Sequence, residues 1–309
     1  MRVVSLLPSA TEVLCRIGGA HLLVGRSHEC DWPAEIGHLP VLTGARTHAS
    51  GAGASAAIDA QVRESLAEGK SLYTLDADLL RSLEPDVILT QDLCDVCSID
   101  LNTVRGVAAT MPRPPKILSL DPHTIWQVFD DCLRVGEAVG LLSQADRAMV
   151  ELRGQYWEAV DFVAPYVDAP EVLFLEWMEP CFVGGHWTPE LITAAGGRHS
   201  LNAAGQKSRV VSPEEILEAA PERIVISPCG WGLPQIAAEL PRLQAQRWWP
   251  LLPAVMEGSE GSQPRVILVD GNQMFNRPGP RLVDAFRFLV GWLNNRPEVI
   301  PPGFPFRAL

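Results

Sequence analysis

The stretch DLLRSLEPDVILT, residues 78–90, reads as a helix, a turn at Pro85 and a short buried strand. The apolar run 86–90 is bounded by the proline turn and a polar loop, as buried strands usually are. A helix followed at once by a buried strand is typical of proteins in which helices alternate with parallel strands. The stretch therefore predicts an α/β fold.

The second half of the chain repeats this order. Setting Pro85 against Pro221 aligns residues 78–90 with EEILEAAPERIVI, residues 214–226. In each half a helix, a proline turn and a buried strand lead into a loop that carries cysteine. We therefore predict a structural repeat, with one copy in each half of the chain.

Short apolar runs alternate with amphipathic stretches along most of the chain, which predicts β/α units around mainly parallel sheets. The predicted strands are RVVSLL (2–7), LLVGRS (22–27), DVILT (86–90), KILSL (116–120), EVLFLEW (171–177), RIVIS (223–227) and RVILVD (265–270). Ser9 is predicted to cap a helix over residues 10–19 that ends at Gly18 and Gly19.

About forty residues of helical periodicity, 126–166, separate the strands of the two halves, with a break predicted at Gly140. We predict an α/β fold of two lobes with mainly parallel central sheets, joined by a long backbone helix within about residues 144–166. The predicted division is an N-terminal lobe over 1–122, a helical connection over 123–168 and a C-terminal lobe over 169–309.

Composition excludes several classes of partner. The chain has 309 residues, 47% of them apolar, so it can bury a large core. Its formal net charge of -12 argues against nucleic acid, because phosphate binding needs clustered Lys and Arg. No apolar run approaches the roughly 20 residues that cross a bilayer, so no direct membrane insertion is expected.

The start, MRVVSLLPSATEV, reads as a first strand and not as an export signal, because Pro8 breaks its apolar run and no small-residue cleavage site follows. We therefore expect a cytoplasmic location, in which the seven cysteines are reduced. An exported protein whose signal is missing from this sequence is the alternative.

Chemically active residues collect in the loops that follow the predicted strands. The carboxyl ends of parallel strands are where open α/β sheets bind ligands. Four such loops carry, in chain order, His28, Cys30, Asp31 and Trp32; Cys94 and Cys97; Cys181, His186 and Trp187; and Cys229 and Trp231. Only Cys15 and Cys132 fall in predicted helices, where they are most simply small core residues.

The cysteines allow three interpretations. Cys94 and Cys97, in QDLCDVCSID, are a redox pair before a helix that begins near residues 98–100, half of a metal site, or packing residues. A metal site would recruit partners from Cys30, Cys181 and Cys229, since four thiolates suffice for zinc or an iron-sulfur cluster. Against this, a single cysteine in a reduced compartment is most often a buried packing residue.

The histidines and tryptophans are equally open to two interpretations. His28 and His186 are either hydrogen-bonded loop residues or ligands. Four indoles beside strand ends are either lobe core or the apolar wall of a pocket for a large planar ligand: Trp32, Trp177, Trp187 and Trp231. The run GAGASA, residues 51–56, matches a dinucleotide-binding fingerprint only formally, because no strand leads into it, and we predict a flexible loop there.

Several stretches resemble the cobalamin-binding branch of the substrate-binding proteins of ABC importers. They are RVVSLLPSATEVLCRIGGAHLLVGRSHECDWP at 2–33, LEPDVILT at 83–90, AAGG at 194–197, APERIVIS at 220–227 and GNQMFNRPGPRLVDA at 271–285. The resemblance runs from about Arg2 to Trp292. It implies a periplasmic-binding-protein-like fold of two lobes with a long backbone helix.

The resemblance also implies a ligand held between the lobes. It would bring into that cleft the turn of Pro8, Ser9 and Thr11, the HECDWP loop, and the segment 272–278. The residues expected to contact the ligand are Pro8, Ser9, Thr11, His28, Asp31, Trp32, Glu176, Trp177, His186, Trp187, Trp231, Asn272 and Phe275.

We therefore expect a cytoplasmic binding protein, without catalysis, for a small-molecule metal chelate such as cobalamin or another corrinoid, with haem as an alternative. The rival hypothesis is a metal carrier or enzyme on the same scaffold, in which Cys30, Cys94, Cys97, Cys181 and Cys229 hold zinc or an iron-sulfur cluster. An ABC importer permease is expected as a partner only if the protein is exported.

Overall fold

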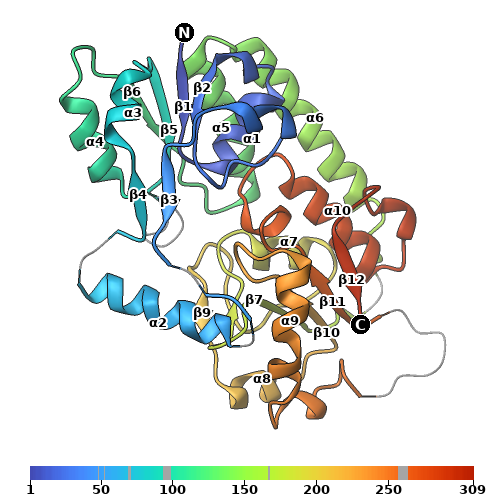
Figure 1. Cartoon of the computed structure of the whole chain (residues 1–309). Helices are drawn as coiled ribbons and strands as arrows, with labels where there is room; N and C mark the ends of the chain where they lie inside the picture. The colour runs from blue at the N-terminus through green and yellow to red at the C-terminus, as the bar shows by residue number, and fades with distance from the viewer. Residues whose placement is uncertain (48, 52, 69–70, 93–98, 166–167, 257–263) are drawn as a thin grey trace. The chain divides into compact units, whose positions relative to one another are not determined.

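The computed structural model describes the whole chain except residues 48, 52, 69–70, 93–98, 166–167 and 257–263 (Figure 1). The chain divides into two compact units. The first unit comprises Met1–His48, Ala60–Pro122 and Trp126–Arg153. The second unit comprises Ala49–Asp59, His123–Ile125 and Gly154–Leu309.

The first unit is built on a parallel four-stranded sheet in the order β2-β1-β5-β6. Its strands are β1 (Val3–Ser5), β2 (Leu23–Arg26), β5 (Val87–Thr90) and β6 (Lys116–Ser119), and a separate antiparallel pair is formed by β3 (Thr43–Ala45) and β4 (Tyr73–Leu75). Its helices are α1 (Pro8–Arg16), α3 (Ala77–Ser82) and α4 (Leu101–Ala109), with short 3₁₀ turns at Ala20–Leu22 and Ala34–His38. This order of strands and helices matches the predicted β/α alternation.

Helix α1 begins earlier than predicted. Pro8 occupies the first helical turn and Leu7 is the capping residue, so Ser9 lies inside the helix and makes no cap. Proline is favoured at that position because its fixed φ suits the helix and its missing N–H would have no partner there. The expected end is confirmed, since Gly18 adopts a φ of 83°.

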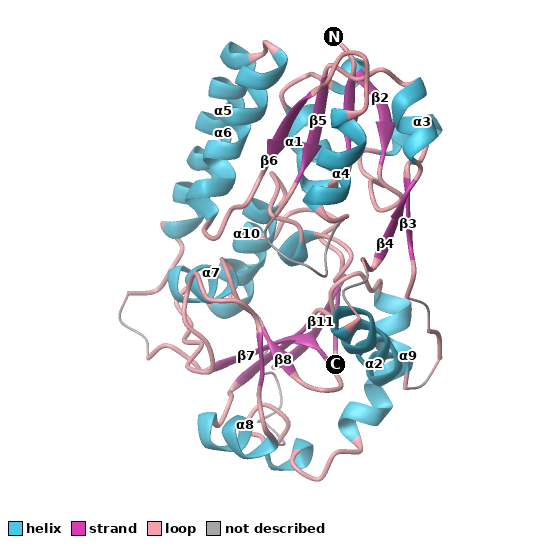
Figure 2. Cartoon of the chain, turned by 90° about the vertical axis from the view of Figure 1, so that its left-hand side faces the viewer, coloured by secondary structure: helices cyan, strands magenta, loops and turns pink. Residues whose placement is uncertain are grey.

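The central helical region forms two helices. Helix α5 (Ile125–Val139) ends at Gly140, which has a φ of 73°, and α6 (Leu142–Val160) follows. The two helices run side by side (Figure 2). Gly136 permits this contact, because a Cβ there would lie 2.3 Å from the Cβ of Ala145. Helix α6 is the long backbone helix that the sequence predicts.

The second unit contains a six-stranded sheet in the order β12-β11-β10-β7-β8-β9, in which β7, β10 and β11 are parallel. Its strands are β7 (Val172–Trp177), β8 (Phe182–Val183), β9 (Arg209–Val210), β10 (Arg223–Ile226), β11 (Val266–Val269) and β12 (Phe306–Ala308). Its helices are α7 (Thr188–Ala194), α8 (Pro213–Ala219), α9 (Leu233–Gln244) and α10 (Leu282–Leu293), with 3₁₀ turns at Trp249–Leu251, Met274–Asn276 and Pro297–Val299. Helix α2 (Ala54–Ala67) has its first six residues in this unit and the rest in the first unit.

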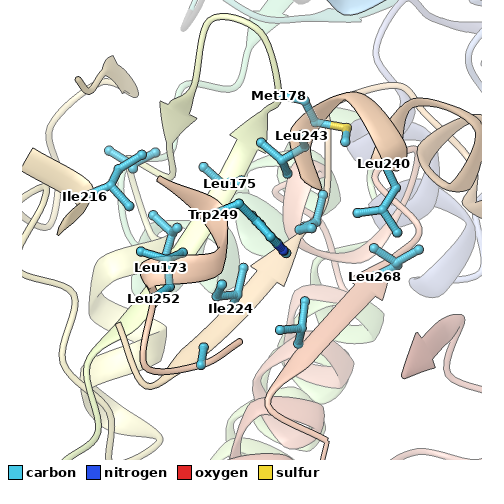
Figure 3. Close-up of a cluster of buried hydrophobic side chains, with 14 of the residues drawn as sticks. Leu173, Leu175, Met178, Ile216, Ile224, Leu240, Leu243, Trp249, Leu252 and Leu268 are labelled. Carbon is cyan, nitrogen blue, oxygen red and sulfur yellow. The ribbon is translucent and has the colours of Figure 1, made fainter. Parts of the chain in front are cut away.

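One face of the second sheet is covered by α8, α9 and the turn at Trp249. Figure 3 shows Leu173, Leu175, Ile224 and Leu268 of the strands packed against side chains of these elements, including Trp249. The strand residues are all fully buried. Burying apolar surface at about 25 cal/mol per Å² makes such a cluster the main source of stability of the unit.

Backbone hydrogen bonds support the predicted repeat. In the first unit the N–H groups of Asp86 and Val87 donate to the carbonyl of Arg2, and the Asp86 carboxylate accepts from the Arg2 N–H at 2.7 Å. In the second unit the N–H groups of Glu222 and Arg223 donate to the carbonyl of Glu171 in the same way. The Glu222 carboxylate accepts from the Glu171 N–H at 3.3 Å. The acidic residue after each aligned proline therefore links its strand to the neighbouring strand.

The predicted fold class is confirmed: the chain is an α/β protein of two units with mainly parallel central sheets and a long backbone helix. All seven predicted strands are present. The run 51–56 differs from its prediction, because Ala54 begins helix α2. Among the helices of the described residues, none combines the length and the apolar character that a membrane span requires.

Candidate functional site

The loops at the carboxyl ends of β7, β10 and β11 are linked by hydrogen bonds into one rigid surface of the second unit. The Cys229 N–H donates to the Glu176 carbonyl at 3.1 Å, and the Gly230 N–H donates to the Gly271 carbonyl at 2.9 Å. The Asn276 side-chain amide donates to the Gly271 carbonyl as well, at 2.9 Å. Such backbone pairing holds the loops at fixed positions, as a preformed ligand site requires.

Gly271 is required at the centre of this surface. A Cβ at that position would lie 1.8 Å from the carbonyl oxygen of Pro228, which no side chain can accommodate. The chain therefore approaches its neighbour as closely as only glycine allows.

Two of the predicted indoles form a pair on this surface. The rings of Trp177 and Trp231 lie 5.2 Å apart, centroid to centroid, and are tilted by 58°. Trp231 is 6% exposed and packs in the core cluster, whereas Trp177 is half-buried. Trp177 thus offers ring surface at the end of β7, and Trp231 supports it from beneath.

Glu176 directly precedes Trp177 at the end of β7. Its carboxyl accepts from the Ser208 hydroxyl at 2.8 Å and from the Gly185 N–H. Burial raises the pKa of Glu176, and the two hydrogen bonds oppose that rise. Burial thus favours the protonated form of this carboxyl group, and the hydrogen bonds that it accepts favour the ionised form.

His186 occupies a strained turn between β8 and α7. It adopts a φ of 53°, and its N–H donates to the Gln206 carbonyl. Gly185, just before it, allows the turn because a Cβ there would lie 2.4 Å from the Ser208 nitrogen. A left-handed backbone at a histidine is uncommon and indicates that the surrounding structure holds it in place.

Two imidazoles and an indole meet at this turn. The ring of His123 lies 5.5 Å from that of His186, and the Trp187 ring is stacked on His186 at 5.5 Å. The Trp187 indole N–H donates to the Phe275 carbonyl at 2.7 Å, which fixes the orientation of the ring. The His186 Nδ1 atom is buried and has no hydrogen-bond partner in the described part of the chain.

The surroundings of this turn favour the uncharged form of His186. Burial lowers the pKa of His186, and His123 and Lys207 lower it further by repulsion. A neutral imidazole presents a nitrogen lone pair, which is the form that binds haem iron or cobalt.

The segment after β11 supplies the remaining predicted residues of the second unit. Phe275 is 1% exposed and makes an edge contact with Phe174 at 5.0 Å. Asn272 is half-buried, and its side-chain carbonyl accepts from Arg277 at 3.2 Å. Phe275 therefore contributes packing and a backbone carbonyl, and Asn272 contributes a polar side chain.

In the first unit, the predicted residues of α1 are buried. Pro8, Ser9 and Thr11 all lie in the first turns of the helix, and the Thr11 hydroxyl donates to the Cys30 sulfur at 3.1 Å. Cys30 is fully buried, and its sulfur lies 3.9 Å from the Ser5 carbonyl. Thr11 and Cys30 thus hold the start of α1 against the loop after β2.

The rest of that loop forms a polar cluster at the edge of the first unit. His28 Nδ1 is 2.7 Å from the Thr43 hydroxyl, and its ring lies 5.6 Å from that of Tyr73. The Tyr73 hydroxyl donates to Glu29 at 3.3 Å. Nearby in sequence, Asp31 is exposed and Trp32 is 49% exposed, so both can contact a ligand or a partner.

The structure describes only some of the cysteines in the predicted metal site. Cys94 and Cys97 lie outside the described residues, so their role stays a prediction. Cys30 belongs to the first unit, and Cys181 and Cys229 belong to the second. Within the described residues, no three His, Cys, Asp or Glu side chains are arranged to hold a metal ion.

The thiol of Cys181 is suited to packing. Burial raises its pKa to about 12, with a further contribution from Glu179, and the thiol lies 3.3 Å from the Met178 carbonyl. The thiolate is the form that binds metals, so this environment disfavours it.

Sequence reasoning missed several residues of these clusters, among them His123, Ser208 and Tyr73. His123 follows strand β6 just as the predicted residues follow theirs, so the same rule applied to KILSLDPH would have found it. Ser208 and Tyr73 had no comparable signal.

No protein-family model and no curated protein matches the sequence. Solved structures match over nearly the whole chain. The periplasmic haem-binding protein RhuT from Roseiflexus sp. RS-1, in apo form, is 20% identical with a TM-score of 0.70, covering 96% of this chain and 98% of that chain. The periplasmic haem-binding protein HutB of Vibrio cholerae is 16% identical with a TM-score of 0.68, covering 94% and 97%.

The periplasmic vitamin B12 binding protein BtuF of Vibrio cholerae is 18% identical with a TM-score of 0.62, covering 96% of this chain and 98% of that chain. The protein thus has the two-lobed α/β fold of the substrate-binding proteins of ABC importers, as the resemblance implies. These three structural neighbours are, by name, binders of haem and of vitamin B12.

Proposed function

We propose that this protein binds a metal chelate of the corrinoid or haem type and releases it unchanged, without catalysis. The observation that carries the proposal is the group of His123, His186 and Trp187, in which two imidazoles lie next to a stacked indole. An uncharged imidazole is a ligand for iron and for cobalt. Trp187 is 6% exposed and stacks on His186, so it would hold the imidazole in place behind the macrocycle.

Other side chains of the second unit would complete the contacts. The exposed part of Trp177 would stack on the macrocycle. The carboxyl group of Glu176, at the end of β7, would hydrogen-bond a peripheral amide of the chelate. In this proposal these groups bind and orient the chelate.

The test is spectroscopic. Purified protein is titrated with aquocobalamin and, separately, with ferric protoporphyrin, and the visible spectrum and affinity are recorded. We expect at least one of these chelates to bind at micromolar concentration with the spectral change of imidazole coordination. His186→Ala and His123→Ala should each weaken binding by about 10-fold or more and alter that spectrum.

A matched control is His21→Ala, because His21 is an exposed residue of the first unit whose ring contacts only the Gly18 carbonyl in the described hydrogen bonds. It should leave both spectrum and affinity unchanged. Failure of both chelates to bind the unaltered protein would refute the proposal. Binding that His186→Ala leaves unaffected would refute the assigned ligand.

We further propose that the protein delivers its chelate to an ABC importer permease. The periplasmic location stated for its structural neighbours favours the exported alternative over the cytoplasmic location expected from the sequence. Cell fractionation of the native host with an antibody decides between them. A strictly cytoplasmic protein would refute the importer role while leaving chelate binding intact.

A further inference from the structure

A segment of the first half of the chain is built into the second unit. Residues 49–51 and 53–59, here named the strap, lie between β3 and β4 in sequence but belong to the second unit. Ala54 is part of the core cluster of that unit, and Ala49 and Ile58 pack against the cluster. The strap therefore contributes apolar surface to a core formed by residues far away in sequence.

Glu239 of helix α9 holds the strap. Its side chain is almost fully buried, at 2% exposure, and one carboxylate oxygen accepts from the Gly53 N–H at 2.7 Å. The other oxygen accepts from the Ser55 hydroxyl at 2.5 Å. Arg242 lies 3.9 Å away and supplies the nearest positive charge.

These contacts are specific for physical reasons. A buried carboxylate is costly unless hydrogen-bond donors satisfy it, and two of its donors come from the strap. The carboxylate also lies at the amino end of α2, which begins at Ala54, where the helix dipole favours negative charge. Gly53 has a φ of 84°, and a Cβ there would lie 3.2 Å from the Arg242 guanidinium, so glycine suits this contact.

The strap also touches the candidate ligand site. The Ser55 carbonyl accepts from the Trp177 indole N–H at 3.1 Å. Ser55 therefore bonds Glu239 through its side chain and Trp177 through its backbone. Since the Trp177 ring lies 5.2 Å from Trp231, this hydrogen bond fixes the orientation of the indole pair.

We propose that Glu239 is a positioning residue for ligand binding: it docks the strap, and the docked strap holds Trp177 in the orientation that stacks on a chelate. The inference rests on the proposed function for its ligand. The docking itself requires no ligand, so the two can fail separately.

The test compares Glu239→Gln with Glu179→Gln. Glu239→Gln removes the charge and places an amide N–H against a strap donor. Glu179→Gln alters the other carboxylate partner of Arg242, at 2.7 Å, but leaves the strap contacts intact. Three quantities are measured: amide hydrogen exchange of the strap, near-ultraviolet circular dichroism of the ligand-free protein, and affinity for aquocobalamin and ferric protoporphyrin.

We expect Glu239→Gln to accelerate exchange of the strap amides by 10-fold or more, to change the tryptophan circular dichroism, and to weaken chelate binding by 10-fold or more. Glu179→Gln should change the exchange rates and the chelate affinity by less than about twofold and leave the tryptophan circular dichroism unchanged. Ser55→Ala keeps the Glu239 carboxylate and is the second variant to test if Glu239→Gln does not fold. It should also accelerate exchange of the strap amides.

The double variant Glu239→Gln, Trp177→Phe tests whether Glu239 affects chelate binding through Trp177. Phenylalanine keeps an aromatic ring but lacks the indole N–H, so Glu239→Gln added to Trp177→Phe should weaken binding little further. Unchanged strap exchange in Glu239→Gln overturns the docking. Faster exchange with unchanged circular dichroism and affinity overturns the link to Trp177. If the unaltered protein binds neither chelate, the proposed function fails, while exchange and circular dichroism still decide the docking.

Discussion

Asp131 provides a quantitative test of the electrostatics of the first unit. It lies on α5 and is 2% exposed; one carboxylate oxygen accepts from Arg134 at 2.7 Å, and the other, Oδ2, has no partner in the described residues. Burial raises the pKa of Asp131 from 3.8 to about 6, although Arg134 lowers it. Each unit of pKa difference corresponds to about 1.4 kcal/mol, so ionisation of Asp131 lowers the free energy of unfolding by about 3 kcal/mol.

The sign follows from proton binding. Between about pH 4 and pH 6 the folded protein holds the Asp131 proton more tightly than the unfolded chain, so the stability contributed by this group falls as pH rises. Below pH 4 both states are protonated, and above pH 6 both are ionised. Asp131→Asn removes the titration and keeps an acceptor for Arg134.

The assay is urea unfolding of the unaltered protein and of Asp131→Asn from pH 4 to pH 7, combined with hydrogen exchange of the α5 amides. The unfolding free energy of the variant, minus that of the unaltered protein, should grow by about 2 kcal/mol or slightly more across this range, since part of the full effect lies below pH 4. Asp78→Asn is the matched control, because Asp78 makes the same i,i+3 contact with Arg81 but its side chain is 97% exposed. A pH-independent difference for Asp131→Asn would refute the reasoning.

Three further predictions address the second unit and the thiols. Gly271→Ala should lower the free energy of unfolding by about 3 kcal/mol or more, measured by urea unfolding, whereas Gly106→Ala, with open space around it in a helix, should raise it by about 0.5–1 kcal/mol. Burial, His123 and Lys207 lower the pKa of His186 below its ordinary value of 6.5, so chelate binding should stay constant from pH 7 to pH 6.5 and weaken only at a lower pH, where protonation removes the lone pair; an affinity that already falls between pH 7 and pH 6.5 would contradict this. Alkylation of the folded protein followed by mass spectrometry should modify half-buried Cys229 well before fully buried Cys132.

The strands can be predicted from sequence because each is a short apolar run bounded by polar or turn residues. The repeat is visible for the same reason, since Pro85 and Pro221 mark equivalent turns. The predicted start of α1 is wrong, because a serine near a helix start looks like a cap while Pro8 fits the first turn better.

The candidate site is predictable only in outline. The rule that ligands bind after parallel strands locates Trp177 and His186, but it does not tell which indoles are buried, since Trp231 and Trp32 follow strands equally well in sequence. Part of the strap lies in the run 51–56, which is predicted as a loop because no strand leads into its formal match to a dinucleotide-binding fingerprint. Its anchor, Glu239, is an ordinary acidic residue in an amphipathic helix when read alone.

The strap has a consequence for the order of folding during synthesis. Ser55 and Glu239 are 184 residues apart, so at roughly 5–20 residues per second the ribosome makes the anchor on the order of 10 to 40 s after the strap. During that interval Ala49, Ala54 and Ile58 have no core to enter. The nascent chain therefore carries an apolar segment that stays unpacked, and completion of the second unit depends on residues that left the ribosome long before.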